Sequence, residues 1–157
     1  MTSAPDPIPT FHDGNIVGLS ISKGTATLSL VRSDGTPWRI ELEGVRYLRA
    51  DDFREGNIIS YCKAVTKADP PRNLLEALAG GPNELAAQEY HDKYRLFIDD
   101  LAQQIRIGGL TLLIIEPSCG CDFLAISERV MAFEVRFPPI TVIHNVRIAA
   151  CVSRRTL

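Results

Sequence analysis

Apolar residues alternate with polar ones over most of the N-terminal part of the chain, which is the pattern of strands that bury one face. Three consecutive strands are predicted within residues 16–43, separated by turn sequences at residues 23–24 and 34–35. The second turn is Asp-Gly, in which glycine accepts the positive φ of a tight hairpin. A fourth strand is predicted over residues 58–65, after the polar loop of residues 51–57. Short turns between consecutive strands predict an antiparallel meander.

The spacing of apolar residues changes to three and four between residues 69 and 107, which indicates helices. Asp69 followed by proline predicts an N-cap and the first turn of a short helix that Gly80-Gly81 ends. A longer helix is predicted from residues 82–83 to the glycines at 108–109. The apolar stripe that should cover one face of a sheet consists of Tyr90, Tyr94, Phe97, Ile98, Leu101 and Ile105.

The strand pattern returns after residue 110. Strands are predicted over residues 111–116, 122–127 and 131–137, and a last strand is predicted over residues 140–152. A strand block, two helices and a second strand block, without helical crossovers, predict an α+β fold with antiparallel pairing rather than a doubly wound nucleotide-binding fold. We expect about eight strands, in one curved sheet around the long helix or in two packed sheets.

The chain has the length and composition of one folded domain. It has 157 residues, of which 45% are hydrophobic and 23% are charged, and these values are typical of globular domains. We expect a single domain over residues 1–157. Its parts are an extended, proline-containing arm (1–10), a first β block (11–66), a helical segment (69–107) and a second β block (110–153).

Charge and hydropathy limit the partners. The formal net charge of −2 provides no broad cationic field, so we expect no nucleic-acid partner. No apolar run approaches the roughly 20 residues that cross a bilayer, so we expect no membrane partner. The chain start has no basic and apolar signal regions, and the four cysteines are scattered rather than arranged as a disulfide framework. We therefore expect a soluble, cytoplasmic protein with reduced thiols.

Two polar segments carry the residues that we expect to bind a partner or ligand. One precedes the first strand, and the other is the loop of residues 51–57. If the two converge, Arg54 can serve as counter-charge to the carboxylates, although the loop lacks the ligand order of an EF-hand. The competing interpretation is an anchored turn and a solvated loop. The candidate residues are His12, Asp13, Asp51, Asp52, Arg54 and Glu55.

Two thiols and an imidazole form an alternative site. Cys119 and Cys121 flank a glycine in a predicted hairpin turn, and paired thiolates can bind a soft metal or exchange as a disulfide. His144 lies on the apolar side of the last predicted strand, where a tuned imidazole can act as a base or ligand. The competing interpretation is that all three residues only pack or form hydrogen bonds. Zinc sites usually have a second ligand pair, which this chain lacks, so we expect no metal and no other cofactor.

The chain contains none of the common catalytic motifs, such as the phosphate-binding Gly-x-x-x-x-Gly-Lys, His-Glu-x-x-His or Gly-x-Ser-x-Gly. We therefore expect a binding or protein-interaction domain without catalysis. Its partner is another protein or a second copy of the chain, which could pair through residues 140–152. The alternative is a small hydrolase-like or metal-dependent enzyme that uses His144 with Cys119 and Cys121, or the acidic loop.

The long helix offers a second surface for a partner. Glu89 and Lys93 are spaced to form an i,i+4 ion pair, and further charged residues lie on the side away from the apolar stripe. Such a side is usually the solvated face of a helix, and it can also serve as an acidic surface for a basic partner.

A sequence likeness covers residues 11–59. It consists of the Phe-His-Asp-Gly segment 11–14, the Asp-Gly turn at 34–35, Gly-Val at 44–45 and Asp-Phe-Arg-Glu-Gly-Asn-Ile-Ile at 52–59. These segments resemble small bacterial domains, some of which look like immunity proteins of polymorphic toxin systems. The resemblance implies a role in protein interaction, and it carries no catalytic residue.

Overall fold

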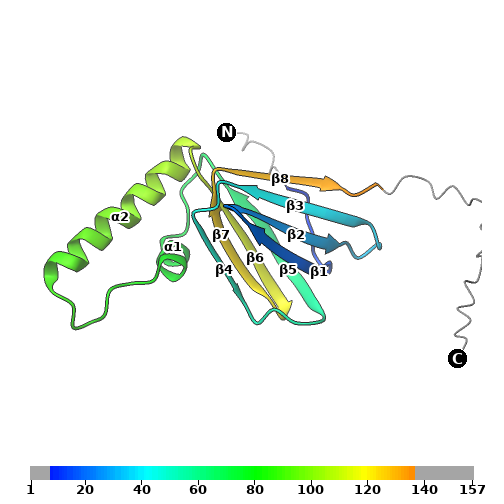
Figure 1. The fold of residues 1–157 in the computed structure, drawn as a ribbon, viewed down its shortest axis with the longest axis horizontal. Coiled ribbons are helices and arrows are strands. Elements are labelled where there is room, and N and C mark those ends of the chain that lie inside the picture. Colours follow the sequence, from blue (N-terminus) through cyan, green and yellow to red (C-terminus); the bar gives the residue numbers. More distant parts are fainter. Residues whose placement is uncertain (1–7, 137–157) are drawn as a thin grey trace, which may run out of the picture.

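The computed structural model describes residues 8–136 and shows an antiparallel sheet with two helices between its strand blocks (Figure 1). This confirms the predicted α+β class, with one short and one long helix. The last predicted strand, residues 140–152, lies outside the described residues. The helices are α1 (Arg72–Ala79) and α2 (Gln88–Ile107). The strands are β1 (Asn15–Ser22), β2 (Thr25–Val31), β3 (Pro37–Glu43), β4 (Tyr47–Asp51), β5 (Asn57–Val65), β6 (Thr111–Cys119), β7 (Asp122–Ser127) and β8 (Arg129–Glu134).

One strand of the sheet was not predicted. The pattern assigned no element to residues 44–50, whereas the structure has β4 there. Four of the five β4 residues are half-buried, so the segment lacks the contrast between buried and exposed positions that marks a strand in sequence. Its pairing with β7, from Tyr47 opposite Ile126 to Asp51 opposite Asp122, establishes it as a strand.

The strand order β4-β7-β6-β5-β1-β2-β3-β8 divides at the centre into two halves. We call β4-β7-β6-β5 the helix-covered half and β1-β2-β3-β8 the open half. The two halves are joined at two places, which we call junctions. At the first junction, β1 pairs with β5 only through Asn15 and Ile16. At the other, β3 runs into β4 through residues 44–46, and β7 runs into β8 through Glu128. Strands that change sheets at bends are the usual corners of packed sheets.

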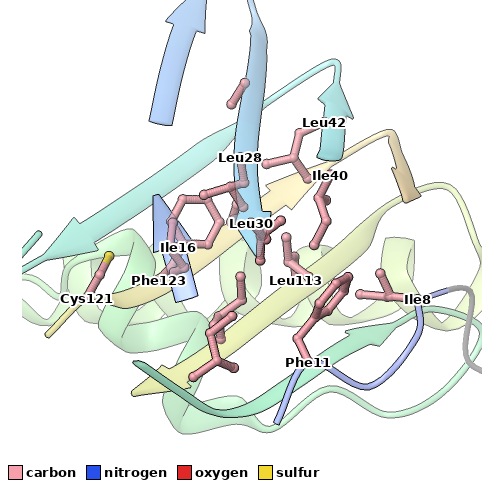
Figure 2. Close-up of a cluster of buried hydrophobic side chains, with 14 of the residues drawn as sticks. Ile8, Phe11, Ile16, Leu28, Leu30, Ile40, Leu42, Leu113, Cys121 and Phe123 are labelled. Carbon is pink, nitrogen blue, oxygen red and sulfur yellow. The ribbon is translucent and has the colours of Figure 1, made fainter. Parts of the chain in front are cut away.

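The two halves face each other across one hydrophobic core. The open half contributes Leu28, Leu30, Ile40 and Leu42, and the helix-covered half contributes Leu113, Ile115 and Phe123 (Figure 2). Burying a side chain of this size stabilises the fold by about 1.5–3 kcal/mol. The sequence did not decide between one curved sheet and two packed sheets. The structure combines the two arrangements, because one hydrogen-bonded sheet folds into two layers.

The N-terminal segment completes this core. Ile8 and Phe11 are buried between the halves (Figure 2). The ring of Phe11 packs edge-to-face on Trp38 with centroids 5.6 Å apart. The Asp13 backbone N–H donates to the Ile59 carbonyl at 2.9 Å, which attaches the segment to β5. The segment therefore contributes to the same core as the sheet.

A second core lies under the helices. Leu112 and Leu124 of the sheet pack with Leu75 of α1 and with Ile98 and Ile105 of α2. The buried residues of α2 are confined to its C-terminal half, and its N-terminal half extends beyond the sheet (Figure 1). The predicted stripe is therefore correct at Ile98, Leu101 and Ile105, whereas Tyr90 is exposed. Neither helix of the described part is long and apolar enough to cross a membrane.

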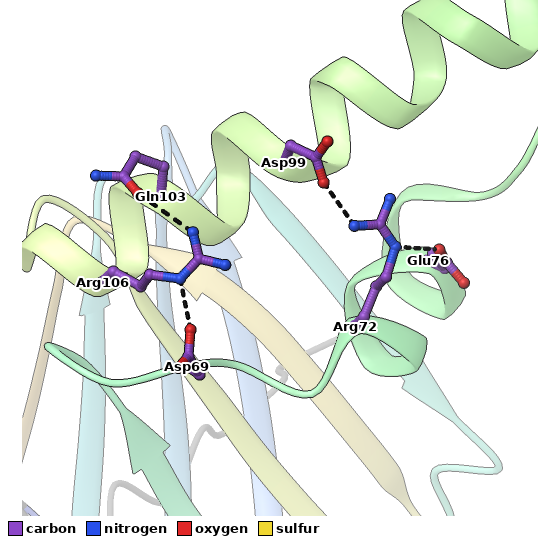
Figure 3. A network of polar contacts seen from close by, with 6 residues as sticks. All are labelled: Asp69, Arg72, Glu76, Asp99, Gln103 and Arg106. Atoms are coloured by element: carbon purple, nitrogen blue, oxygen red, sulfur yellow. Dashed lines mark hydrogen bonds and ion pairs between the residues drawn. The ribbon is translucent and has the colours of Figure 1, made fainter.

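Both helices end as predicted and begin later than predicted. Gly80 and Gly108 follow the two helices with positive φ angles. The prediction of Asp69 as N-cap is wrong, because Pro71 holds that position and the Asp69 carboxylate accepts a bond from Arg106 of α2 (Figure 3). The second helix begins at Gln88 rather than at residues 82–83, because the Asn83 side chain accepts the Leu85 N–H in a turn.

Candidate functional site

Asn57 organises the junction of β1 and β5. This residue begins β5 and is 1% exposed. Its side-chain oxygen accepts the backbone N–H groups of Arg54 and Cys121, both at 3.0 Å, and its amide nitrogen donates to the Ile16 carbonyl at 3.3 Å. One side chain thus fixes the loop of residues 51–57, the β6–β7 turn and β1 in a single arrangement.

Gly120 is required by the same contact. Its φ is +89°, and a Cβ at this position would lie 2.4 Å from Oδ1 of Asn57. The glycine between the two cysteines therefore lets the turn approach Asn57. The sequence predicts this turn and draws attention to its thiols, but it does not predict the role of Asn57. The only signal for Asn57 in the sequence is an amide directly before an apolar strand.

Two of the three acidic residues of the loop, Asp51 and Asp52, are held by ion pairs. Arg49 of β4 lies 3.0 Å from both Asp51 and Asp122, and the Arg54 guanidinium lies 2.8 Å from Asp52. Arg49 also donates to the Ala77 carbonyl of α1 at 3.1 Å, although its Nε atom makes no hydrogen bond within the described part. Exposed pairs of this kind contribute about 0–1 kcal/mol each. Their role here is to hold the loop carboxylates in fixed positions.

His12 and Asp13 form a separate pair. Nδ1 of His12 lies 3.0 Å from the Asp13 carboxylate, and both side chains are largely exposed. No ion pair joins them to the loop carboxylates among residues 8–136. In the same part of the chain, no group of three or more His, Cys, Asp or Glu side chains is placed to hold a metal. Each of the two predicted polar segments therefore forms its own ion pairs, and none of these pairs joins one segment to the other within residues 8–136.

An apolar cavity opens between β1 and the loop. Its volume is about 620 Å³, and its walls include Val17, Phe53, Arg54 and Glu55. Val17 is 59% exposed and Phe53 is 43% exposed, although both are large apolar side chains. Glu55 has no ion-pair partner within the described part. Two of the residues that the sequence predicted as binding residues thus border a hollow that the sequence did not predict.

A second cavity, of about 680 Å³, lies between α2 and the junction where β3 continues into β4 and β7 into β8. Arg46 and Glu128 line it together with Tyr47 and Asp100. The Arg46 guanidinium lies 2.6 Å from the Glu128 carboxylate, so its charge is already neutralised within the molecule. This cavity is more polar than the first and exposes less apolar surface to a partner.

The charged side of α2 is also largely neutralised within the molecule. The predicted pair of Glu89 and Lys93 is confirmed at 2.6 Å, and Asp92 pairs with Arg95. The Arg95 guanidinium is the main cause that lowers the pKa of Asp92. The helix therefore presents mixed, paired charges rather than a continuous acidic surface.

The two thiols of the turn lie in different environments. Cys121 is 1% exposed, and burial raises the pKa of its thiol to about 11, with nearby Asp122 adding to the effect. The thiol is therefore protonated at neutral pH in the metal-free protein. Cys119 is exposed. His144, the third member of the alternative site, lies outside the described residues.

Comparisons with known proteins give no further assignment. No family model matches the chain, no curated protein matches it, and no solved structure matches its fold.

Proposed function

We propose that this chain is a protein-interaction domain that binds its partner through the corner surface, defined as Val17, Phe53, Arg54, Glu55 and the cavity between them. The observation that carries the proposal is the exposure of Val17 and Phe53 around an apolar cavity beside a carboxylate that has no partner in the described part. Apolar anchors within a polar rim are the usual anatomy of a protein interface.

The rigidity of the loop supports this proposal. Asn57 holds the backbone at Arg54, and the ion pair of Asp52 with Arg54 holds the side chains beside Phe53. A surface that is already ordered loses less entropy when it binds, which favours affinity. The resemblance of residues 11–59 to small bacterial domains, some of which look like immunity proteins, also favours a protein partner, and neutralisation of a toxin is one form that such an interaction would take.

The proposal is tested by photo-crosslinking of the full chain in cells. A photoreactive phenylalanine analogue in place of Phe53 should give one discrete protein adduct, identified by mass spectrometry as another protein or as the chain itself. The same analogue in place of Leu96, which is 69% exposed on α2, is the matched control and should give no such adduct. Absence of a protein adduct at Phe53 would contradict the proposal, and clean turnover on a panel of small-molecule substrates would then favour the enzyme.

A further inference from the structure

β1 has an open edge although it lies in the middle of the strand order. Its pairing with β2 continues to Ser22, whereas its pairing with β5 stops at Ile16. Residues 17–22 therefore have no strand partner on the β5 side among residues 8–136. Unpaired strand edges expose backbone N–H and C=O groups that can pair with another chain.

This edge lacks most of the features that normally prevent such pairing. Its sequence, Val-Gly-Leu-Ser-Ile-Ser, contains no charged residue and no proline, and its one irregularity is a bulge between Ile16 and Gly18. Ile21 is 61% exposed, and Val17 of the corner surface is 59% exposed. The outer strands of the sheet differ, because β4 carries Arg49 and Asp51 and β8 begins and ends with charged residues.

We propose that a second copy of this chain pairs antiparallel with residues 17–22, so that two open halves form one continuous sheet across a two-fold axis. This inference rests on the proposed function and names the partner of the corner surface. A two-fold axis at Ser20 places Leu19 opposite Ile21 of the second copy. Leu19 and Ile21 pair with Leu28 and Ala26 of β2, so both lie on the core side of the sheet. This agrees with the proposed register, because opposite residues of an antiparallel pair lie on the same face of the sheet.

Charge complementarity selects a second copy as the occupant. The same register brings Lys23, the first residue of the turn after β1, close to Val17 of the second copy, and Val17 and Glu55 line one cavity. Neither Lys23 nor Glu55 has an ion-pair partner within residues 8–136. The two-fold axis brings Lys23 of each copy to Glu55 of the other, so the contact forms twice. The pairing also stops where Asn57 of β5 already occupies the edge at Ile16.

The test is the mass of the full chain in solution as a function of concentration, measured by analytical ultracentrifugation. The native chain should form a dimer with a dissociation constant in the micromolar range, roughly that of a small interface. Lys23→Glu and Glu55→Lys should each weaken the dimer about tenfold, because two like-charge contacts replace two ion pairs. Lys63→Glu, an exposed charge reversal on β5, is the matched control and should change nothing.

Mixing the two variants distinguishes this contact from a folding defect. Lys23→Glu and Glu55→Lys chains should restore association when combined, because both contacts of the mixed dimer are again between opposite charges. Ile21→Lys, which places a charge on the open edge, should abolish the dimer without rescue. A dimer that neither charge reversal weakens would overturn the inference.

A chain that stays monomeric up to about 1 mM would also overturn the inference. Hydrogen exchange then identifies what covers the edge. Slow exchange in the monomer of those residue 17–22 amides that point away from β2 would assign the edge to another segment of the same chain, and fast exchange of these amides would leave it open. Neither outcome refutes the proposed function, which fails only if Phe53 gives no protein adduct in cells.

Discussion

The two halves of the sheet are built on different sequence patterns because they are covered differently. In the helix-covered half, β6 and β7 contain continuous runs of buried residues, since one face meets the shared core and the other meets the helices. In the open half, β2 alternates between buried and partly exposed positions, since residues 8–136 cover only its core side. A single antiparallel sheet can therefore combine both patterns, and the pattern reports what covers each face.

Exchanging one residue type between the halves is the largest test of this difference. Leu112→Thr leaves a cavity and a buried hydroxyl under the helices, and it should lower the free energy of unfolding by about 3 kcal/mol. Thr27→Leu, on the outer face of β2, should change it by no more than about 0.5 kcal/mol. Urea denaturation measures both. Equal losses would mean that the outer face of the open half is also covered.

The junction between the halves gives the next largest effect. Asn57→Ala leaves the N–H groups of Arg54 and Cys121 without their acceptor, and it should lower the free energy of unfolding by about 2–3 kcal/mol. Asn83→Ala is the matched control, because it also removes one side-chain bond to a backbone N–H, of Leu85, but at an exposed position. That variant should lose less than about 0.5 kcal/mol in the same urea titration. Similar losses in the two variants would contradict the role of Asn57 at the junction.

Titration of Cys121 in the shared core should make the stability of the fold depend on pH. Because its pKa is raised to about 11 in the folded protein, the folded state holds this proton more strongly than the unfolded chain. The stabilisation that this proton gives the folded state is fully present below the ordinary thiol pKa. The free energy of unfolding then falls by about 2 kcal/mol as the pH rises through 9 toward 11. Urea denaturation between pH 8 and 11 should show a steeper decline for the native chain than for Cys121→Ala. Parallel declines would show that this thiol does not titrate between the two states.

Sequence reasoning succeeded where local chemistry decides the structure. Gly80 and Gly108 end the helices because their positive φ angles depend on only a few neighbouring residues. The strands of residues 111–116 and 122–127 were predicted for a similar reason, since an apolar run and a turn are visible in a short window. Turns and helix ends are thus the most predictable parts of this fold.

Sequence reasoning failed where the hydrogen-bonding or strand-pairing partner of a residue is distant in sequence. Asn57 bonds to Cys121 across 64 positions, and Arg49 bonds to Asp122 across 73 positions, so no local pattern indicates either. β4 depends in the same way on β7. The polar loop was predicted one residue too long at each end, because Asp51 belongs to β4 and Asn57 to β5. The cavity and the residues that hold the loop were not predicted.

The attachment of α1 to α2 gives the smallest effect and concerns only the helix-covered half. Arg72 bonds to Glu76 and to Asp99, and these two carboxylates raise its pKa, so it stays charged (Figure 3). Arg72→Met should speed amide exchange in α1 and leave the open half unchanged, because the pair holds one helix against the other. About 1 M salt should remove the difference from the native chain, since screening acts over about 3 Å there. Arg95→Met, which breaks a pair within α2, should leave α1 exchange unaltered. Equal acceleration of α1 exchange by Arg95→Met would show that the Arg72 pairs have no specific role in holding α1 against α2.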